Sequence, residues 1–306
     1  MRTDNRHTIP SRDISLAPAD DHRHTLKSGE HEAFYFPFTS PEGNLFGFMR
    51  TLFDQDIVLE IMALHIGGCV WIHQHRAPLP DSPVTAAEAS GPSLSLTCSQ
   101  PWQEWDCRFH SSVRQLSGEK TLQANLDLKF VSTNAPAVYS FGTYHQAQQD
   151  GRLRGQIQVG AEEWAGELLC YRDHSWGQRP IGMTTAWTIA SAPDRFHVIA
   201  AEVQGQPLGF GRFVTPDGQL VPVRIPRITV ADTGWRIEDV KAGLAPWHVQ
   251  RLAPPLVFYL GPPGYEAFRD GPRPGDLYLD ELGPAIFTSL QGEQVAGFLD
   301  QARRLE

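Results

Sequence analysis

The sequence of 306 residues is short of several features that define large classes of protein. Its four cysteines include no C-x-x-C pair, so we interpret them as reduced, buried thiols and predict no zinc site built on cysteine. No basic run interrupts the net charge of −9, which argues against nucleic acid as a partner. The glycine motifs of nucleotide-binding loops are also missing, so we expect chemistry without a cofactor.

Long hydrophobic runs are absent as well. No stretch approaches the ~20 uninterrupted apolar residues that a membrane-spanning helix requires, so no transmembrane segment is expected. The first thirty residues are polar and lack the apolar centre of a signal peptide. We therefore expect a cytoplasmic protein in which residues 1–30 form a flexible arm.

What the sequence does contain is a dense succession of strand patterns. Apolar residues alternate with serine and threonine from Leu94 to Cys98, and with polar residues from Leu122 to Phe130, which is typical of strands with one buried face. Short apolar runs bounded by Gly, Pro or Asp continue through the second half. A helical pattern occurs only from Gln294 to Arg304, where it predicts a short C-terminal helix.

The length of the chain indicates how these strands are organised. It exceeds what one hydrophobic core usually holds, so we predict two all-β domains of the sandwich or barrel type. A turn signal near Gly160 to Gly166 marks the boundary. The predicted domains cover residues 31–166 and 167–306.

The segment from Tyr171 to Pro180 concentrates a histidine, a carboxylate, two guanidinium groups and a large aromatic ring. Its Asp-His-Ser run has the residue types of a hydrolase triad, but neighbours on a strand point to opposite faces, so such a triad cannot close. One face carries Asp173 and Ser175, and the other carries Arg172, His174 and Trp176. A histidine packed against an indole can act as an acid or base near neutral pH. A purely structural role is an equal alternative.

The string Arg-Asp-His-Ser-Trp-Gly-x-Arg at 172–179 resembles the signature of the carotenoid 1,2-hydratase and AttH-like superfamily. Further similarity lies at 32–36, 124–130 and 155–159, and the likeness is strongest over 120–215. The resemblance implies two lipocalin-like antiparallel β-barrels packed together, with a hydrophobic cavity in or between them. Relatives hydrate isolated double bonds of carotenoids, and similar two-barrel proteins act as cyclases.

The resemblance leads us to expect an enzyme that uses acid-base catalysis, without a cofactor, on a hydrophobic isoprenoid- or polyketide-like substrate. Double-bond hydration needs a proton donor and aromatic faces that stabilise a carbocation, and intramolecular cyclisation is the other expected reaction. We expect His174 with a carboxylate, Asp173 or Glu202, as the acid-base pair. The expected substrate-binding residues are Arg172, Trp176, Tyr171, Trp187, Phe210 and Tyr144.

Other functions fit the same sequence. A lipocalin-type barrel can carry a lipid or terpenoid without changing it, and an accessory partner in a biosynthetic complex is a third interpretation. His73 and His75 share one strand face, with His65 on a neighbouring segment, as in some metal sites. Two polar residues that leave a strand before a proline loop are the simpler interpretation, so we assign no metal site. A titratable group buried against a cavity would favour an enzyme over a carrier.

Overall fold

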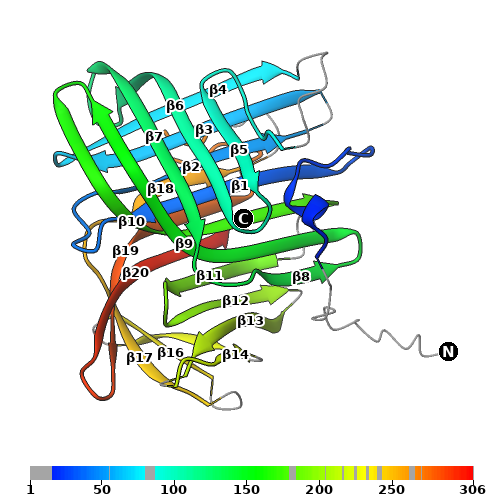
Figure 1. Ribbon diagram of the computed structural model, residues 1–306, viewed down its shortest axis with the longest axis vertical. Helices are drawn as coiled ribbons and strands as arrows, with labels where there is room; N and C mark the ends of the chain where they lie inside the picture. The colour runs from blue at the N-terminus through cyan, green and yellow to red at the C-terminus, as the bar shows by residue number, and fades with distance from the viewer. Residues whose placement is uncertain are drawn as a thin grey trace.

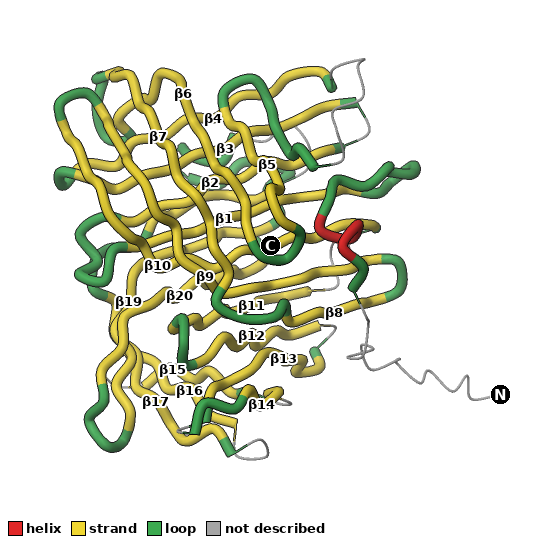
Figure 2. The backbone as a smooth tube through the Cα atoms, viewed as in Figure 1, coloured by secondary structure: helices red, strands yellow, loops and turns green. Residues whose placement is uncertain are grey.

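The computed structural model describes residues 16–305 with short gaps. The residues outside this description are 1–15, 55, 80–86, 179–183, 204, 216, 224–225, 232–233, 240–242, 262–265, 270 and 306. The described residues form strands β1 to β20 and one short 3-10 helix, η1 (Pro18–Asp21). Two antiparallel sheets of ten strands each lie one above the other in Figure 1, and Figure 2 shows how little of the chain is helical. The predicted all-β fold is confirmed.

The first sheet comes from the N-terminal half of the chain and closes on itself. Its strands are β1 (His31–Thr39), β2 (Phe46–Phe53), β3 (Ile57–Ile66), β4 (Cys69–Pro78), β5 (Leu94–Gln100), β6 (Glu104–Gln115), β7 (Thr121–Ser132), β8 (Ala137–Phe141), β9 (Tyr144–Val159) and β10 (Glu162–Gly177). Strand β10 pairs with both β1 and β9, which completes a barrel. The boundary that the sequence predicts at residue 166 lies inside β10, whose pairing with β9 continues to Trp176.

The second sheet contains the rest of the chain. Its strands are β11 (Thr184–Ala192), β12 (Phe196–Val203), β13 (Gln206–Val214), β14 (Leu220–Val223), β15 (Arg227–Ala231), β16 (Gly234–Asp239), β17 (Leu244–Arg251), β18 (Leu256–Leu260), β19 (Tyr278–Ser289) and β20 (Gln294–Arg304). Its pairing order is β14-β13-β12-β11-β20-β19-β17-β16-β15, and β18 lies beside β19. The predicted C-terminal helix is wrong, because Gln294–Arg304 is the strand between β11 and β19.

The positions of the cores explain why the sequence of β20 has an apolar pattern like that of a helix. Phe298 belongs to the apolar layer between the two sheets, whereas Leu299 belongs to the core of the second sheet. Because both faces of β20 are buried, apolar residues occupy adjacent positions and the two-residue alternation disappears. In contrast, the alternating strands predicted around Leu94 and Leu126 have one face in the interior of the first barrel.

The layer between the sheets is the part of the fold that positions the candidate site. Strand β2 is buried along its whole length, since one face lines the first barrel and the other packs on the second sheet. Phe48 of β2 lies 4.9 Å from Phe258 of β18, measured between ring centroids. The two sheets therefore share an apolar interface as well as having their own cores.

The segment before β1 is anchored to the first barrel in its described part. Asp21, at the end of η1, is fully buried and accepts hydrogen bonds from the backbone N–H of Trp102 at 2.6 Å and the indole Nε1 of Trp105 at 3.1 Å. Figure 2 shows η1 in red against the edge of the first sheet. From Leu16 onward the predicted arm therefore includes a docked turn.

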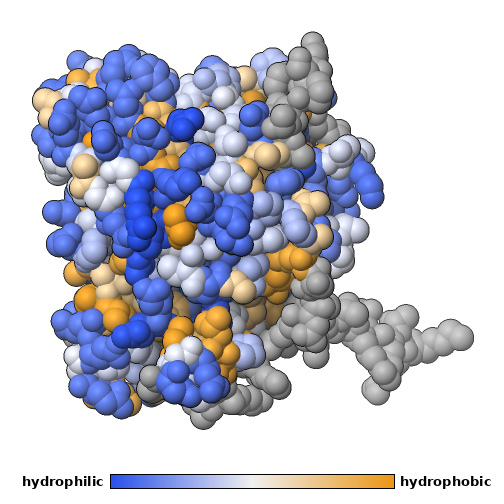
Figure 3. All heavy atoms as spheres, viewed as in Figure 1, coloured by the Kyte–Doolittle hydropathy of each residue, from blue (hydrophilic) through white to orange (hydrophobic). Residues whose placement is uncertain are grey.

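On the face in Figure 3, apolar side chains appear in small patches among polar ones. No helix in the described residues has the length and apolar character needed to cross a membrane.

Candidate functional site

Strand β10 divides the side chains of the central segment between two environments. Asp173 and Ser175 line a cavity between the sheets. Arg172 and His174, on the other face, are fully buried toward the first barrel. This alternation is the one that the sequence predicts, and Arg179 and Pro180 lie outside the described residues. The strand ends at Gly177, where φ is +99° and a Cβ atom would lie 1.9 Å from the carbonyl oxygen of Thr143, so only glycine fits.

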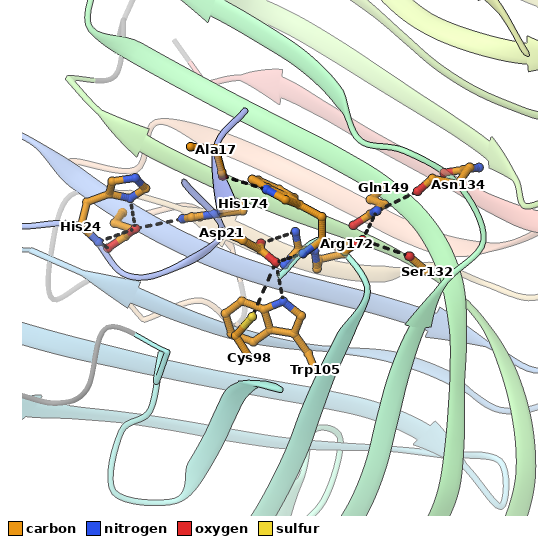
Figure 4. Close-up of polar contacts among 12 residues, drawn as sticks. Ala17, Asp21, His24, Cys98, Trp105, Ser132, Asn134, Gln149, Arg172 and His174 are labelled. Atoms are coloured by element: carbon orange, nitrogen blue, oxygen red, sulfur yellow. Dashed lines mark hydrogen bonds and ion pairs between the residues drawn. The ribbon is translucent and has the colours of Figure 1, made fainter. Parts of the chain in front are cut away.

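On the barrel face, Arg172 forms a buried ion pair with Asp21 through Nη2 and Oδ1. Its guanidinium group also lies over the rings of Trp102 and Trp105, at 5.1 and 5.3 Å from their centroids. Figure 4 shows Asp21 between Arg172 on one side and Trp105 and Cys98 on the other. The two charges compensate each other inside the barrel, so this pair attaches η1 to β10.

His174 has its own partners on the same face. Its Nε2 lies 2.9 Å from Oε1 of Glu32, and Nδ1 of His24 lies 2.7 Å from the same oxygen. Burial lowers the pKa of His174 although Glu32 acts in the opposite direction, which leaves the imidazole neutral. Burial opposes the charge of Glu32, but hydrogen bonds from His174 and His24 still lower its pKa. His174 therefore faces Glu32 and does not line the cavity.

The cavity lies between the sheets and has a volume of about 240 Å³. Most of its wall is apolar: Leu52, Trp187, Ile189, Ile199, Phe210 and Phe258 are among the lining residues. A few polar side chains converge on this apolar space, which is the usual composition of a small-molecule site.

Four of these polar side chains form a row across the first sheet. Gln148 of β9 is opposite Asp173 of β10, Asp173 is opposite Tyr35 of β1, and Tyr35 is opposite Arg50 of β2. Directly opposite residues of an antiparallel sheet point to the same face, and all four line the cavity. The register of four strands thus places an amide, a carboxylate, a phenol and a guanidinium group side by side.

Two aspartates of the second sheet, Asp280 of β19 and Asp300 of β20, complete the polar part of the cavity. Oδ2 of Asp300 accepts hydrogen bonds from the hydroxyl of Tyr171 at 2.7 Å and from the hydroxyl of Tyr35 at 3.3 Å. Oδ1 of each aspartate is buried and has no hydrogen-bond partner among the described residues. The two carboxyl groups are buried and diagonal to each other on paired strands, and like charges this near disfavour ionisation of both, so one of them holds a proton.

The surroundings of this carboxyl pair keep that proton in place. Burial raises the pKa of Asp280 well above its ordinary value, and the charge of Asp300 adds to the effect while Arg50 opposes it. Burial also raises the pKa of Asp300, despite hydrogen bonds that favour its ionised form. The carboxyl pair can therefore present an acidic proton to an apolar ligand near neutral pH.

Asp173 is positioned by a chain of buried hydrogen bonds. Its Oδ2 accepts from the side-chain amides of Gln148, at 2.6 Å, and Gln146. Oε1 of Gln148 lies 2.5 Å from Nε2 of His197, whose Nδ1 lies 3.1 Å from Oδ1 of Asp150. Burial opposes the charge of Asp150, but His197 and Arg212 lower its pKa, so this end of the chain is ionised.

The predicted site residues have different positions relative to the cavity. Asp173, Trp187, Phe210 and Tyr144 line it. Tyr171 is buried beside it and donates its hydroxyl proton to Asp300. Arg172, His174, Trp176 and Glu202 are not among the lining residues. Glu202 is exposed and accepts a hydrogen bond from Thr185, and Trp176 stacks on His24.

The histidines considered for metal binding, His65, His73 and His75, form no cluster of ligand atoms within the described residues. Nδ1 of His73 lies 3.1 Å from the carbonyl oxygen of Ser112, and the rings of His73 and His75 are 6.3 Å apart. His65 stacks on Phe46. The four cysteines are free thiols, and three of them are buried as predicted, whereas Cys69 is half-buried.

Sequence reasoning did not identify Asp280, Asp300 or Tyr35. Each of them does leave a signal, because a polar residue sits inside an apolar run: Tyr-Leu-Asp at 278–280, Phe-Leu-Asp at 298–300 and Phe-Tyr-Phe at 34–36. A carboxylate in a strand that is otherwise buried must have a partner or hold a proton, and either condition makes it a site candidate.

Comparison with known proteins identifies relatives of the fold. A family model described as a domain of unknown function (DUF7064) matches residues 17–241. An AttH-like protein of Nitrosomonas europaea has a TM-score of 0.62 and 13% identity, over 94% of this chain and 97% of its own. Kievitone hydratase from Nectria haematococca has a TM-score of 0.57 and 10% identity, over 98% and 94%. CghA has a TM-score of 0.55 and 9% identity, over 92% and 90%.

At these identities the three structures share the fold with this chain. The predicted likeness to AttH-like two-barrel proteins is confirmed at that level. No curated protein sequence matches the chain.

Proposed function

The chain belongs to the DUF7064 family, and we propose that it is an enzyme that adds water to a carbon–carbon double bond of a hydrophobic substrate held between the sheets. The observation that carries the proposal is the carboxyl pair Asp280–Asp300, which is buried and lines a mostly apolar cavity, where burial favours the protonated form. A carrier would need no acidic proton against its ligand, and burial of a carboxyl group costs stability, so its position beside a cavity favours a functional role. Kievitone hydratase, which is named for a hydration, has the same fold.

The proposed reaction uses side chains that line the cavity. The carboxyl pair transfers its proton to one carbon of the double bond, whose π electrons form the new C–H bond and leave a carbocation on the other carbon. The aromatic faces of Trp187, Phe210 and Phe258 stabilise that cation. Water then attacks the cation and loses a proton to Asp173, which gives the alcohol. Asp173 then releases its proton to solvent, and a proton from solvent restores the carboxyl pair.

The volume of the cavity limits the part of the substrate that it can enclose. About 240 Å³ is small beside the ~300–1,000 Å³ of common ligand pockets. We therefore propose that the enclosed group is a compact isoprenoid or polyketide-like unit, such as a prenyl group on a ring. A nucleophile within the substrate could replace water at the same cation, and the reaction would then be a cyclisation.

Two measurements test the proposal. Native mass spectrometry of protein purified from its own host should reveal a co-purifying hydrophobic ligand, which would identify the substrate class. Prenylated phenols and short isoprenoids incubated with the protein in isotopically labelled water should then gain one labelled oxygen. Conversion without label would indicate cyclisation, and binding of these compounds without conversion would establish the carrier instead.

A further inference from the structure

The barrel face of β10 holds a second cluster of titratable side chains, and its composition is that of a metal site. His24, Glu32 and His174 each offer one ligand atom, and the three atoms lie within 4.8 Å of one another. Nδ1 of His24 and Nε2 of His174 approach the same carboxylate oxygen of Glu32, and Figure 4 shows the two rings directed toward it. No other group of His, Cys, Asp and Glu in the described part of the chain meets this spacing.

The three side chains come from separate segments and are held by aromatic packing. His24 follows η1, Glu32 is at the start of β1, and His174 is near the end of β10. The ring of His174 stacks on Phe34 with centroids 4.0 Å apart, and the ring of His24 stacks on Trp176 at 4.6 Å. The two imidazoles thus keep their orientation before any ion arrives, which reduces the cost of binding.

The far side of each ring bears on which nitrogen holds the proton. Nε2 of His24 and Nδ1 of His174 are buried and have no hydrogen-bond partner among the described residues. A partner at the far nitrogen normally decides which nitrogen of a neutral imidazole carries the proton. Without an ion, the near nitrogens carry the protons that bond to Glu32. When an ion binds, each near nitrogen loses its proton, the far nitrogen carries the ring proton, and both near nitrogens present a lone pair next to the carboxylate.

We propose that Nδ1 of His24, the carboxylate of Glu32 and Nε2 of His174 bind one divalent transition-metal ion of the zinc type. Two imidazoles and one carboxylate suit Zn²⁺, Co²⁺ or Fe²⁺, whereas Ca²⁺ and Mg²⁺ prefer oxygen ligands alone. Three protein ligands leave a position for water. The side chain of His24 is 24% exposed and provides a route of entry, while Glu32 is fully buried. The ion would fasten the segment after η1 to the barrel.

This site is on the opposite face of β10 from the cavity, so it does not depend on the proposed hydration. Zn²⁺ alone is the probe. The full-length protein, without a histidine tag, is stripped with a chelator and titrated with Zn²⁺ by calorimetry. We expect one saturable site per chain, a rise in the melting temperature on binding, and a Co²⁺ absorption spectrum typical of four or five nitrogen and oxygen ligands.

Substitutions assign the site. Glu32→Gln and His24→Gln should each weaken Zn²⁺ binding at least ~100-fold, since even residues that only support a ligand cost 10–100-fold. The matched control is His73→Gln with His75→Gln, which removes two neighbouring imidazoles elsewhere and should leave the affinity unchanged. If Glu32→Gln does not fold, His24→Gln decides the question, because His24 is partly exposed and outside the strands. Weak binding at several sites, or equal affinity in the His24 variant, would overturn the proposal.

Discussion

The two faces of strand β10 are equally rich in polar side chains, but they differ in what completes them. On the barrel face, Arg172 forms an ion pair with Asp21 and His174 forms a hydrogen bond with Glu32, so each group has a partner within the protein. On the cavity face, Asp173 accepts hydrogen bonds from glutamine amides and lines the same mostly apolar cavity as Asp280 and Asp300. Density of polar residues is therefore common to both faces, while an acidic proton next to open apolar space distinguishes the one suited to catalysis.

The largest expected effect concerns the carboxyl pair. Asp280→Asn and Asp300→Asn each remove the acidic proton at nearly constant volume, and we expect turnover to fall ~10²–10⁴-fold. The control is Glu281→Gln, which changes the neighbouring carboxylate outside the cavity and should leave turnover intact. Turnover is measured as incorporation of labelled oxygen, and the fold is checked by circular dichroism. Full activity in either aspartate variant would show that the acid lies elsewhere.

Substitutions on the barrel face of β10 should change the free energy of unfolding. Arg172→Met leaves the buried carboxylate of Asp21 without its partner, and loss of one member of a buried ion pair costs ~3–5 kcal/mol. Asp21→Asn combined with Arg172→Met removes both charges and should recover most of that loss. Urea unfolding of the single and double variants measures the difference. If the double variant is as unstable as the single one, packing rather than charge holds η1 against β10.

Part of this comparison can be read from the sequence. Alternation along residues 172–176 gives the division between the faces, because the period of a strand is independent of its surroundings. It does not reveal which face meets a cavity, since that depends on where the second sheet packs. The partners of the motif could not be predicted either. Asp21 and Arg172 are 151 positions apart in the sequence (172 − 21), and only the fold brings them together.

The carboxyl pair was harder to predict for a related reason. Asp300 is opposite Leu282 in the pairing of β19 with β20, so Asp280 is its diagonal neighbour across the two strands. The sequence pattern of Gln294–Arg304 favoured a helix, and a helix would not have placed Asp300 beside Asp280. The error in secondary structure therefore concealed Asp300 as a site residue.

The pH dependence of the free energy of unfolding tests the carboxyl pair on the cavity side. The folded-state pKa of Asp280 is raised, so the folded protein keeps a proton that the unfolded chain releases above pH ~4. Stability should fall as the pH rises from that point to the folded pKa, by up to ~1.4 kcal/mol per pH unit. Asp280→Asn should reduce this slope, and the variant should gain stability relative to the wild type as the pH rises. Urea unfolding across this range measures it, and parallel curves would contradict a proton held by the pair.

The smallest expected effect tests whether two adjacent residues of β10 point to opposite faces. Ser175 lines the cavity, so Ser175→Leu should occupy part of its volume and weaken binding of an apolar fluorescent probe severalfold. Trp176 packs on His24 on the other face, so Trp176→Phe should leave probe affinity unchanged and lower the melting temperature slightly. Fluorescence titration and thermal unfolding of both variants separate the two responses. If Trp176→Phe weakened the probe while Ser175→Leu did not, the ligand would bind on the barrel face, and the catalytic assignment would return to His174.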